Sequence, residues 1–300
     1  MLSGEYQCNK IMTERRNIRI GPSGNSISFY EAGYKSTFQA PEFLHGFGLN
    51  AYEYSFGRGI NMTDEMAEKI RVAFCQADIQ LSVHAPYYTN LASSDSEKIE
   101  KTFGYILESI KIANKMGAKR VVVHPGSLTK QTREAAFDNA AKNFEKLMFY
   151  LDETVDKDAD YLLCLETLGK QGQLGTLDEV LALTKSHKKA TACIDFGHIN
   201  SITKGSLKAA GDYEKLIIKT IEELGEERAK NIHIHFSKIM YGSSGEIRHL
   251  TFDDTEYGPE FYPLAHIIHK YNLAPVIICE SKGTMAEDAA KIKQILHQVK

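Results

Sequence analysis

Six short apolar runs in this chain each end in a histidine or a carboxylate, which are residue types that bind divalent metal ions. The six terminal residues are His84 (LSVH), His124 (VVVH), Glu166 (LLCLE), Asp195 (ACID), His233 (NIH) and Glu280 (VIICE). Any one of them alone has an ordinary structural explanation, but six polar residues in equivalent places would each be costly to bury without a partner. The pattern therefore indicates one shared metal centre.

The chemistry of such a centre depends on how many ions it holds. A carboxylate can bridge two ions roughly 3.5–4 Å apart and trap a hydroxide between them, which suits hydrolysis. His198, three residues after Asp195, and the pair Glu246 and His249 in GEIRH could hold a further ion. His235 shares a strand face with His233 and is also placed to reach the interior. The histidines on helical stretches or before a glycine turn are assigned no role: His45, His187, His266, His269 and His297.

The elements that must position these residues alternate along the chain. Strand-like runs lie at about 18–22, 49–56, 79–84, 119–124, 161–166, 191–196, 231–236 and 275–280. Stretches with helical periodicity lie between most of them, at 63–78, 96–117, 132–155, 176–187, 212–230, 262–272 and 286–300. The connection after the first strand is weaker, and 237–261 is a long loop after the seventh.

Strands that alternate with helices favour parallel βαβ units, and continuous apolar strands are typical of a sheet covered on both faces. Eight such units predict an α/β fold, a (β/α)8 TIM barrel, as a single domain over residues 1–300. The carboxyl ends of barrel strands meet at one mouth, where active sites lie, so we expect the metal site there.

Composition limits the other classes of protein. A net charge of −3 gives no basic field for nucleic acid, although bound metal ions would add positive charge that composition does not count. No GxGxxG follows a strand, so a dinucleotide-binding fold has no support. Without a signal peptide or an 18-residue apolar stretch, we expect a cytoplasmic protein with no membrane contact. Five cysteines without a CxxC pair suggest buried, reduced thiols.

At the ligand residues, the chain resembles the endonuclease IV family of abasic-site endonucleases, trinuclear-zinc barrels of the xylose isomerase-like superfamily. The resemblance runs from about residue 17 to the C-terminus. It rests on HAPYYTNLAS (84–93), HPGS (124–127), LETLGKQGQLGT (165–176), CIDFGH (193–198), HIHFSK (233–238) and PVIICES (275–281). The gapless match to HIHFSK selects His233 over His235 and includes Lys238.

The resemblance implies three zinc ions, with manganese or iron as alternatives at individual sites. His84, His124 and a bridging Glu166 would hold the first ion. Glu166, Asp195, His233 and Glu280 would hold the second, and His198, Glu246 and His249 the third. Glu166 and Glu280 would be catalytic. A metal-bound hydroxide would attack the phosphorus 5′ to an abasic site in DNA, as a step of base-excision repair.

The resemblance also implies substrate-binding roles for Tyr87, Tyr88, Asn90 and Lys238, and a monomer. The two tyrosines fall where the family presses residues into the base stack, and their ordinary alternative is to line the mouth. The chain departs from the family in two places. It has Glu246-Ile-Arg-His249 where the family has Asp-x-His, and its short EYSFGRGINM loop offers only Arg58 for DNA entry.

Two other functions remain open from the sequence. A single-metal sugar isomerase or epimerase on the same barrel could use Glu166, Asp195, His233 (or His235) and Glu280. Such an enzyme has no need of His84, His124, His198 and His249 as ligands, and their presence favours phosphodiester hydrolysis. A non-catalytic metal-binding or DNA-binding barrel has little support, because no ligand of the bridged pair is missing.

Overall fold

Eight parallel strands form the centre of the structure, a computed structural model that describes residues 18–57 and 59–299. They are β1 (Arg19–Pro22), β2 (Ala51–Ser55), β3 (Gln80–His84), β4 (Arg120–Val123), β6 (Leu162–Glu166), β8 (Ala190–Asp195), β9 (His233–Phe236) and β12 (Val276–Cys279). Hydrogen-bonded neighbours follow the order β1-β12-β9-β8-β6-β4-β3-β2. At the remaining seam, Asn50 N donates to Ile20 O at 3.0 Å, and Ser23 bridges to Glu53. The predicted (β/α)8 TIM barrel is confirmed.

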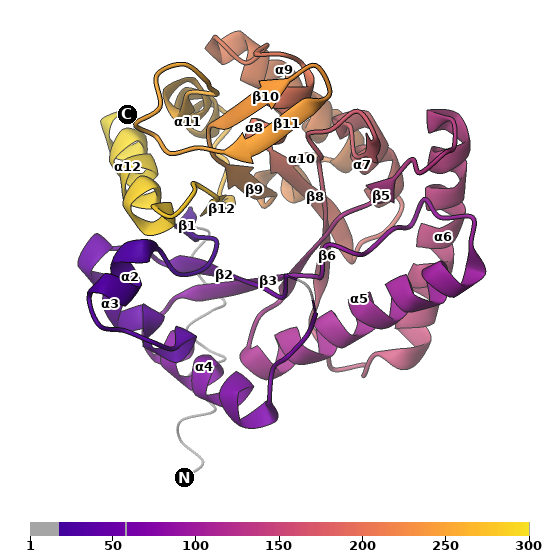
Figure 1. Cartoon of the computed structure of the whole chain (residues 1–300), viewed down its shortest axis with the longest axis horizontal. Helices are drawn as coiled ribbons and strands as arrows, with labels where there is room; N and C mark the ends of the chain where they lie inside the picture. The colour runs from indigo at the N-terminus through magenta and orange to yellow at the C-terminus, as the bar shows by residue number, and fades with distance from the viewer. Residues whose placement is uncertain (1–17, 58, 300) are drawn as a thin grey trace.

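Helices surround this barrel on all sides (Figure 1). The main ones are α3 (Ala40–Phe47), α4 (Asp64–Gln76), α5 (Ser96–Met116), α6 (Arg133–Thr154), α7 (Leu177–Thr184), α9 (Ala210–Leu224), α11 (Phe261–Lys270) and α12 (Met285–Gln298). The shorter ones are α2 (Ile27–Glu31), η1 (Thr37–Gln39), α8 (Phe196–Ile202) and α10 (Glu226–Lys230). Their ends follow local signals: Asp95 accepts from the amides of Glu97 and Lys98 to cap α5, and Gly117 ends it with φ of 75°.

Three local expectations differ from the structure. The helix expected over 212–230 is two helices, because Gly225 adopts φ of 80° between α9 and α10. A short helix, α8, begins directly after β8, where Asp195 accepts from the amide of His198. The segment 237–261 is not a plain loop, because it contains an antiparallel hairpin of β10 (Ile239–Gly242) and β11 (Gly245–His249). A further small pair joins β5 (Gly126–Ser127) to β7 (Gln173–Leu174).

Strand alternation divides the buried side chains into two regions. Along β6, Leu163 and Leu165 belong to the large apolar core shared with the helices. Cys164 instead packs with Val122 and Cys193 in a separate cluster inside the barrel. The residue two positions before each mouth residue therefore forms a lower interior layer, as expected for a packed barrel.

The cysteine expectation needs one correction. Cys164, Cys193 and Cys279 are free and buried, as expected. Cys75 is disulfide-bonded, so the expectation of reduced thiols is wrong there. Cys8 lies outside the described residues. No helix in the described part of the chain is both long and apolar enough to cross a membrane.

The barrel seam generates a stability prediction at Gly21. A Cβ at this position would lie 1.7 Å from the carbonyl oxygen of Ala51, so β1 and β2 would have to separate. We expect Gly21→Ala to lower the free energy of unfolding by about 1–3 kcal/mol in urea titrations, as overpacking does. Gly46→Ala in α3 is the control, because its Cβ meets nothing within 4 Å. Equal stability of the two variants would contradict the close approach at the seam.

Candidate metal centre

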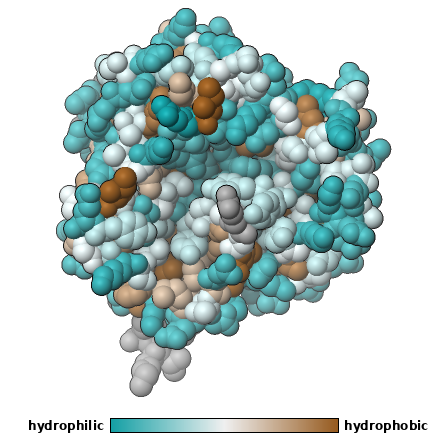
Figure 2. All heavy atoms as spheres, viewed as in Figure 1, coloured by the Kyte–Doolittle hydropathy of each residue, from teal (hydrophilic) through white to brown (hydrophobic). Residues whose placement is uncertain are grey.

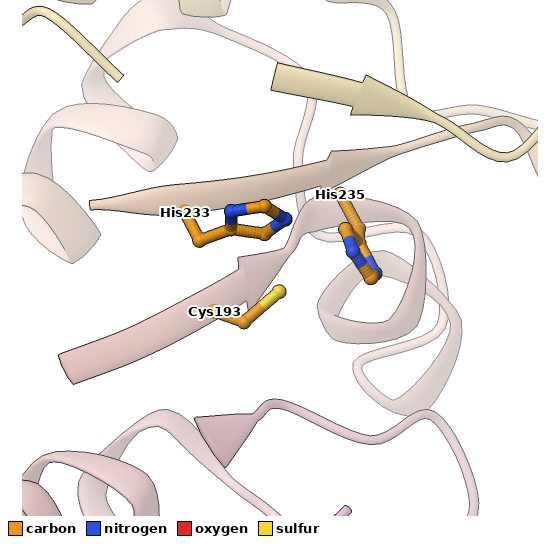
Figure 3. Close-up of side chains that lie close together, drawn as sticks. All are labelled: Cys193, His233 and His235. Carbon is orange, nitrogen blue, oxygen red and sulfur yellow. The ribbon is translucent and has the colours of Figure 1, made fainter. Parts of the chain in front are cut away.

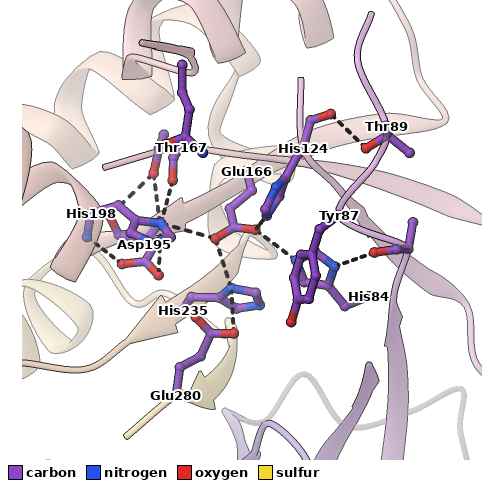
Figure 4. Close-up of polar contacts among 12 residues, drawn as sticks. His84, Tyr87, Thr89, His124, Glu166, Thr167, Asp195, His198, His235 and Glu280 are labelled. Carbon is purple, nitrogen blue, oxygen red and sulfur yellow. Dashed lines mark hydrogen bonds and ion pairs between the residues drawn. The ribbon is translucent and has the colours of Figure 1, made fainter. Parts of the chain in front are cut away.

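The carboxyl ends of the strands bring most of the expected ligand residues together at one mouth of the barrel. Figure 4 shows six of them around His235: His84, His124, Glu166, Asp195, His198 and Glu280. Each ligand group has donor atoms within 4.8 Å of one another. The first group is His84, His124 and Glu166; the second is Glu166, Asp195, His235 and Glu280; the third is His198, Glu246 and His249. The first two groups share Glu166, and His198 of the third group lies 3.2 Å from Glu166 Oε1, so the three groups adjoin one another.

Glu166 lies between the first two groups and turns one oxygen to each. Its Oε2 is 3.0 Å from His84 Nε2 and 3.1 Å from His124 Nε2. Its Oε1 is 3.4 Å from His235 Nδ1 and 3.2 Å from His198 Nδ1. Two oxygens that face different sets of ligands are the arrangement that a bridging carboxylate requires.

Backbone and hydroxyl groups orient three of the imidazoles. His84 Nδ1 lies 2.8 Å from the carbonyl of Ala85, which leaves Nε2 for Glu166. His198 Nδ1 lies 2.9 Å from Thr167 O, and His249 Nδ1 lies 2.8 Å from Ser237 Oγ. A partner on one ring nitrogen fixes the tautomer and leaves the other nitrogen available to a ligand.

The third group depends on an irregularity in the β10–β11 hairpin. Residues three apart on a regular strand point to opposite faces, so Glu246 and His249 would diverge. The register shifts in the ladder, where Met240 pairs with Arg248 but Tyr241 pairs with Glu246, so Ile247 is left over. A bulge of this kind reverses the alternation and places both side chains on one side. The bulge therefore accommodates the one extra residue that this chain has between its carboxylate and its histidine, compared with the Asp-x-His pattern.

Two glycines dock this hairpin against the loop after β6. Glu246 N donates to Gly169 O at 2.9 Å, directly below the third group. Gly245 has φ of +101°, and a Cβ there would lie 2.1 Å from Gly169 O. A Cβ on Gly169 would lie 2.9 Å from the His198 ring and 3.0 Å from Glu246 Cβ. The third group can assemble only because both positions lack side chains.

Burial and mutual charge shift the pKa values of the centre strongly. Burial alone would raise the pKa of Glu166, but the imidazoles of His124 and His235 outweigh it and hold that pKa well below its usual range. Burial raises the pKa of Asp195 to about 6, against the opposing charge of His198. Burial lowers the pKa of His198, yet the carboxylates of Asp195 and Glu166 raise it to about 10. The buried carboxylates thus create a field that favours cations.

The residues present fit divalent cations. Asp195 Oδ2 and His235 Nδ1 are buried and form no hydrogen bond within the described residues. Orphaned polar atoms of this kind are costly unless a further partner, such as a cation, approaches them. The donor set of imidazoles and carboxylates is the one that zinc, manganese and iron accept.

One expected ligand is placed differently from the prediction. The structure places His235, not His233, in the group with Glu166 and Asp195. The register is the reason, because His235 pairs with Asp195 while His233 pairs with Cys193, one layer deeper. His233 Nε2 instead lies 3.0 Å from Glu53 Oε2.

Glu53 is the polar residue that sequence reasoning missed. It is fully buried and lies inside β2, where it contacts both His233 and His235. A glutamate within the strand run LNAYEYSF was the available signal, because a charged residue rarely lies inside a barrel without partners.

Of the two tyrosines expected to contact substrate, only Tyr87 lines the mouth cavity. Tyr87 is 52% exposed, lines the mouth and packs against the rings of His84 and His124. Tyr88 is exposed but faces Tyr105. Arg58 lies outside the described residues.

Asn90 and Lys238 have structural contacts away from the mouth cavity. The side chain of Asn90 accepts from the amides of Ala92 and Ser127, which orders the loops around it. Lys238 is buried, and its Nζ donates to the Asp254 carbonyl at 2.7 Å and to Glu260 at 2.6 Å. Neither residue lines the cavity, so the expected direct contact with substrate has no geometric support.

A cavity of about 490 Å³ opens above the centre. The space-filling view shows a hollow on this face, bordered largely by hydrophilic and neutral side chains (Figure 2). Glu166, Glu280, Glu246 and His249 reach it, and Lys170 and Lys282 add two cations to its lining. The candidate ligands are therefore accessible from this cavity.

Comparison with known proteins identifies the family. Residues 41–297 match the family described as xylose isomerase-like TIM barrel. The chain is 32% identical to an uncharacterized protein of Methanocaldococcus jannaschii, over 81% of this chain and 86% of that protein. The chain therefore belongs to the xylose isomerase-like TIM barrel family.

More specific likenesses point in two directions. The chain is 30% identical to a probable endonuclease 4 of Mycoplasmoides gallisepticum, over 66% of this chain and 63% of that protein. Endonuclease IV of Thermus thermophilus superposes with a TM-score of 0.62 at 18% identity, covering 88% of this chain and 93% of that one. A D-tagatose 3-epimerase-like protein gives 0.64 at 22% identity, covering 84% and 88%. The structural likenesses establish the barrel, which hosts both activities.

The docking of the hairpin generates a prediction about metal content. Gly245→Ala must displace the hairpin from Gly169 and with it Glu246. We expect this variant to bind about one divalent ion fewer per chain than the unaltered protein, measured by elemental analysis after equilibration with zinc.

The matched control is Gly172→Ala in the loop between β6 and β7 that faces the hairpin, where a Cβ meets nothing within 4 Å. It should keep the full ion content. An unchanged content in Gly245→Ala would show that Glu246 and His249 hold no ion.

Proposed function

We propose that the protein is a divalent-metal-dependent phosphodiesterase that hydrolyses DNA 5′ to abasic sites, acting as a zinc-loaded monomer in cytoplasmic base-excision repair. The observation that carries this proposal is the shared Glu166, which joins two ligand groups to each other and contacts His198 of a third. A multinuclear centre suits phosphodiester hydrolysis, because both the attacking and the leaving oxygen need stabilisation. The likeness to proteins named endonuclease 4 supports the same assignment.

Glu166 and Glu280 have different roles in the proposed reaction. When bound, the divalent ions would polarise the phosphodiester and lower the pKa of a water. Glu166 is almost fully buried and holds the first two groups at a fixed separation. The Glu280 side chain is 16% exposed, against 0% for Asp195, and it lines the cavity. The Glu280 carboxylate is thus placed to accept a proton from an attacking water.

The rim supplies features that suit a nucleic acid strand. Lys170 and Lys282 offer positive charge beside the cavity, and Arg248 lies exposed on the neighbouring hairpin. Tyr87 presents an exposed aromatic face next to the first group, its hydroxyl 3.2 Å from Ser55 Oγ. Exposed aromatic rings stack on unpaired bases, and cations contact phosphates.

A single-metal sugar epimerase is the second candidate. The group of Glu166, Asp195, His235 and Glu280 is complete without the others, and a D-tagatose 3-epimerase-like protein shares the barrel. This alternative leaves His124, Glu246 and His249 without a role at the mouth, which is why we prefer the phosphodiesterase.

Metal content separates the two candidates. Protein purified without added metal is analysed by inductively coupled plasma mass spectrometry. We expect about three ions per chain, mainly zinc. Chelator treatment should then abolish incision of an abasic-site duplex, and zinc should restore it. One ion per chain, or manganese alone, would favour the epimerase, whose test is interconversion of ketoses.

Glu166→Gln tests the bridge directly. The amide keeps the size of the side chain but replaces one ligand oxygen by an NH2 group, which cannot bind a metal. We expect incision to fall by at least about 100-fold while circular dichroism stays unchanged. Glu100→Gln on the exposed face of α5 is the control and should keep full activity. Full activity in Glu166→Gln would refute the bridging role.

A further inference from the structure

A buried carboxylate lies one layer beneath the metal centre, between two imidazoles. Glu53 Oε2 is 3.0 Å from His233 Nε2, and Glu53 Oε1 is 2.9 Å from His235 Nε2. All three side chains are 0% exposed.

The carboxylate of Glu53 is itself held from a neighbouring strand. Ser82 Oγ on β3 donates to Glu53 Oε2 at 2.8 Å, and His233 Nε2 meets the same oxygen from β9. The pKa of Glu53 is well below its usual range, because the nearby imidazoles outweigh the effect of burial. An ionised carboxylate at this depth is tolerated only with such partners, so its position is fixed before any metal binds.

His235 turns its two ring nitrogens in different directions. Nδ1 faces the centre, 3.4 Å from Glu166 Oε1 and 3.5 Å from Glu280 Oε1. Nε2 faces down toward Glu53 Oε1 in an ion-pair contact of 2.9 Å, and neither atom forms a hydrogen bond within the described chain. With a metal ion on Nδ1 the imidazole would carry one proton, and the carboxylate beside Nε2 would hold that proton there.

We propose that Glu53 is a positioning residue that holds His235 as the Nε2–H tautomer and presents Nδ1 to the second ligand group. The proposal rests on the proposed metal centre. Carboxylates that accept from the distal nitrogen of a metal-bound histidine fix its ring and strengthen it as a ligand. His233 and Ser82 take part by fixing Glu53.

A rival explanation is a cation inside the barrel itself. Cys193 lies close to both histidines (Figure 3), and the three have donor atoms within 4.8 Å of one another. We favour the hydrogen-bonded arrangement because His233 and Ser82 already bond to Glu53.

The decisive variant is Glu53→Gln, which keeps the side-chain volume and replaces one acceptor oxygen by a donor. Zinc binding is measured by competition with a chromophoric chelator, in the full-length protein. We expect one equivalent to bind about 10- to 100-fold more weakly than in the unaltered protein. Unfolding curves without metal verify that the fold survives.

Cys193→Ala is the matched control, because it removes a side chain at the same depth and leaves Glu53 and both histidines in place. We expect it to keep the ion content and affinity of the unaltered protein. Loss of one equivalent in Cys193→Ala, or a thiolate charge-transfer band after cobalt substitution, would establish the interior cation and overturn the proposal.

A nuclear magnetic resonance readout separates positioning from a general loss of structure. In protein labelled with ¹⁵N-histidine and loaded with zinc, His235 should show zinc on Nδ1 and a proton on Nε2. In Glu53→Gln this signature should weaken or change. Zinc on Nε2, or unaltered signals and affinity in Glu53→Gln, would refute the proposal. If the unaltered protein binds no divalent ion, the metal centre itself fails instead.

Discussion

The mutual repulsion of buried carboxylates at the barrel mouth is the constraint on which the rest of the structure depends. Glu166, Asp195 and Glu280 converge on one small volume, with Glu246 beside them. Like charges in a medium of low polarity are stable only when cations or protons lie between them. Burial raises the pKa of Asp195, and the charges of Glu280 and Glu166 raise it further. Burial lowers the pKa of His198, but the carboxylates of Asp195 and Glu166 outweigh burial and raise it. Divalent ions bound between these carboxylates would lower the repulsion and would also supply the proposed chemistry.

Inward-facing side chains of the barrel form two layers, one at the mouth and one beneath it. Parallel strands place one inward residue at the mouth and another two positions earlier, so each ligand has a partner layer beneath it. At β9, the upper residue is His235 and the lower is His233, and Glu53 from β2 contacts both. In this proposal the buried layer orients His235 toward the ligand group above it, in addition to packing the barrel interior.

Part of the proposed distinction between nuclease and epimerase chemistry rests on residues outside the barrel strands. Both activities occur among proteins that share this fold, and the group formed by Glu166, Asp195, His235 and Glu280 suits either. The β10–β11 hairpin adds Glu246 and His249, and its bulge and two glycines determine whether they arrive on the same side as His198. A small change in this hairpin would therefore alter the third group without disturbing the barrel.

The sequence by itself determined the barrel and most of the mouth. Eight apolar runs at regular spacing specify parallel strands, and a ligand at the end of a strand must reach the mouth because parallel strands point the same way. The sequence did not determine whether His233 or His235 joins Asp195, because both share one face and only the register between β8 and β9 separates their depths. Nor did it reveal Glu53 as their partner, because that contact joins residues about 180 positions apart. Long-range register and the bulge at Ile247 are tertiary outcomes, since they depend on how strands slide against one another rather than on local preference.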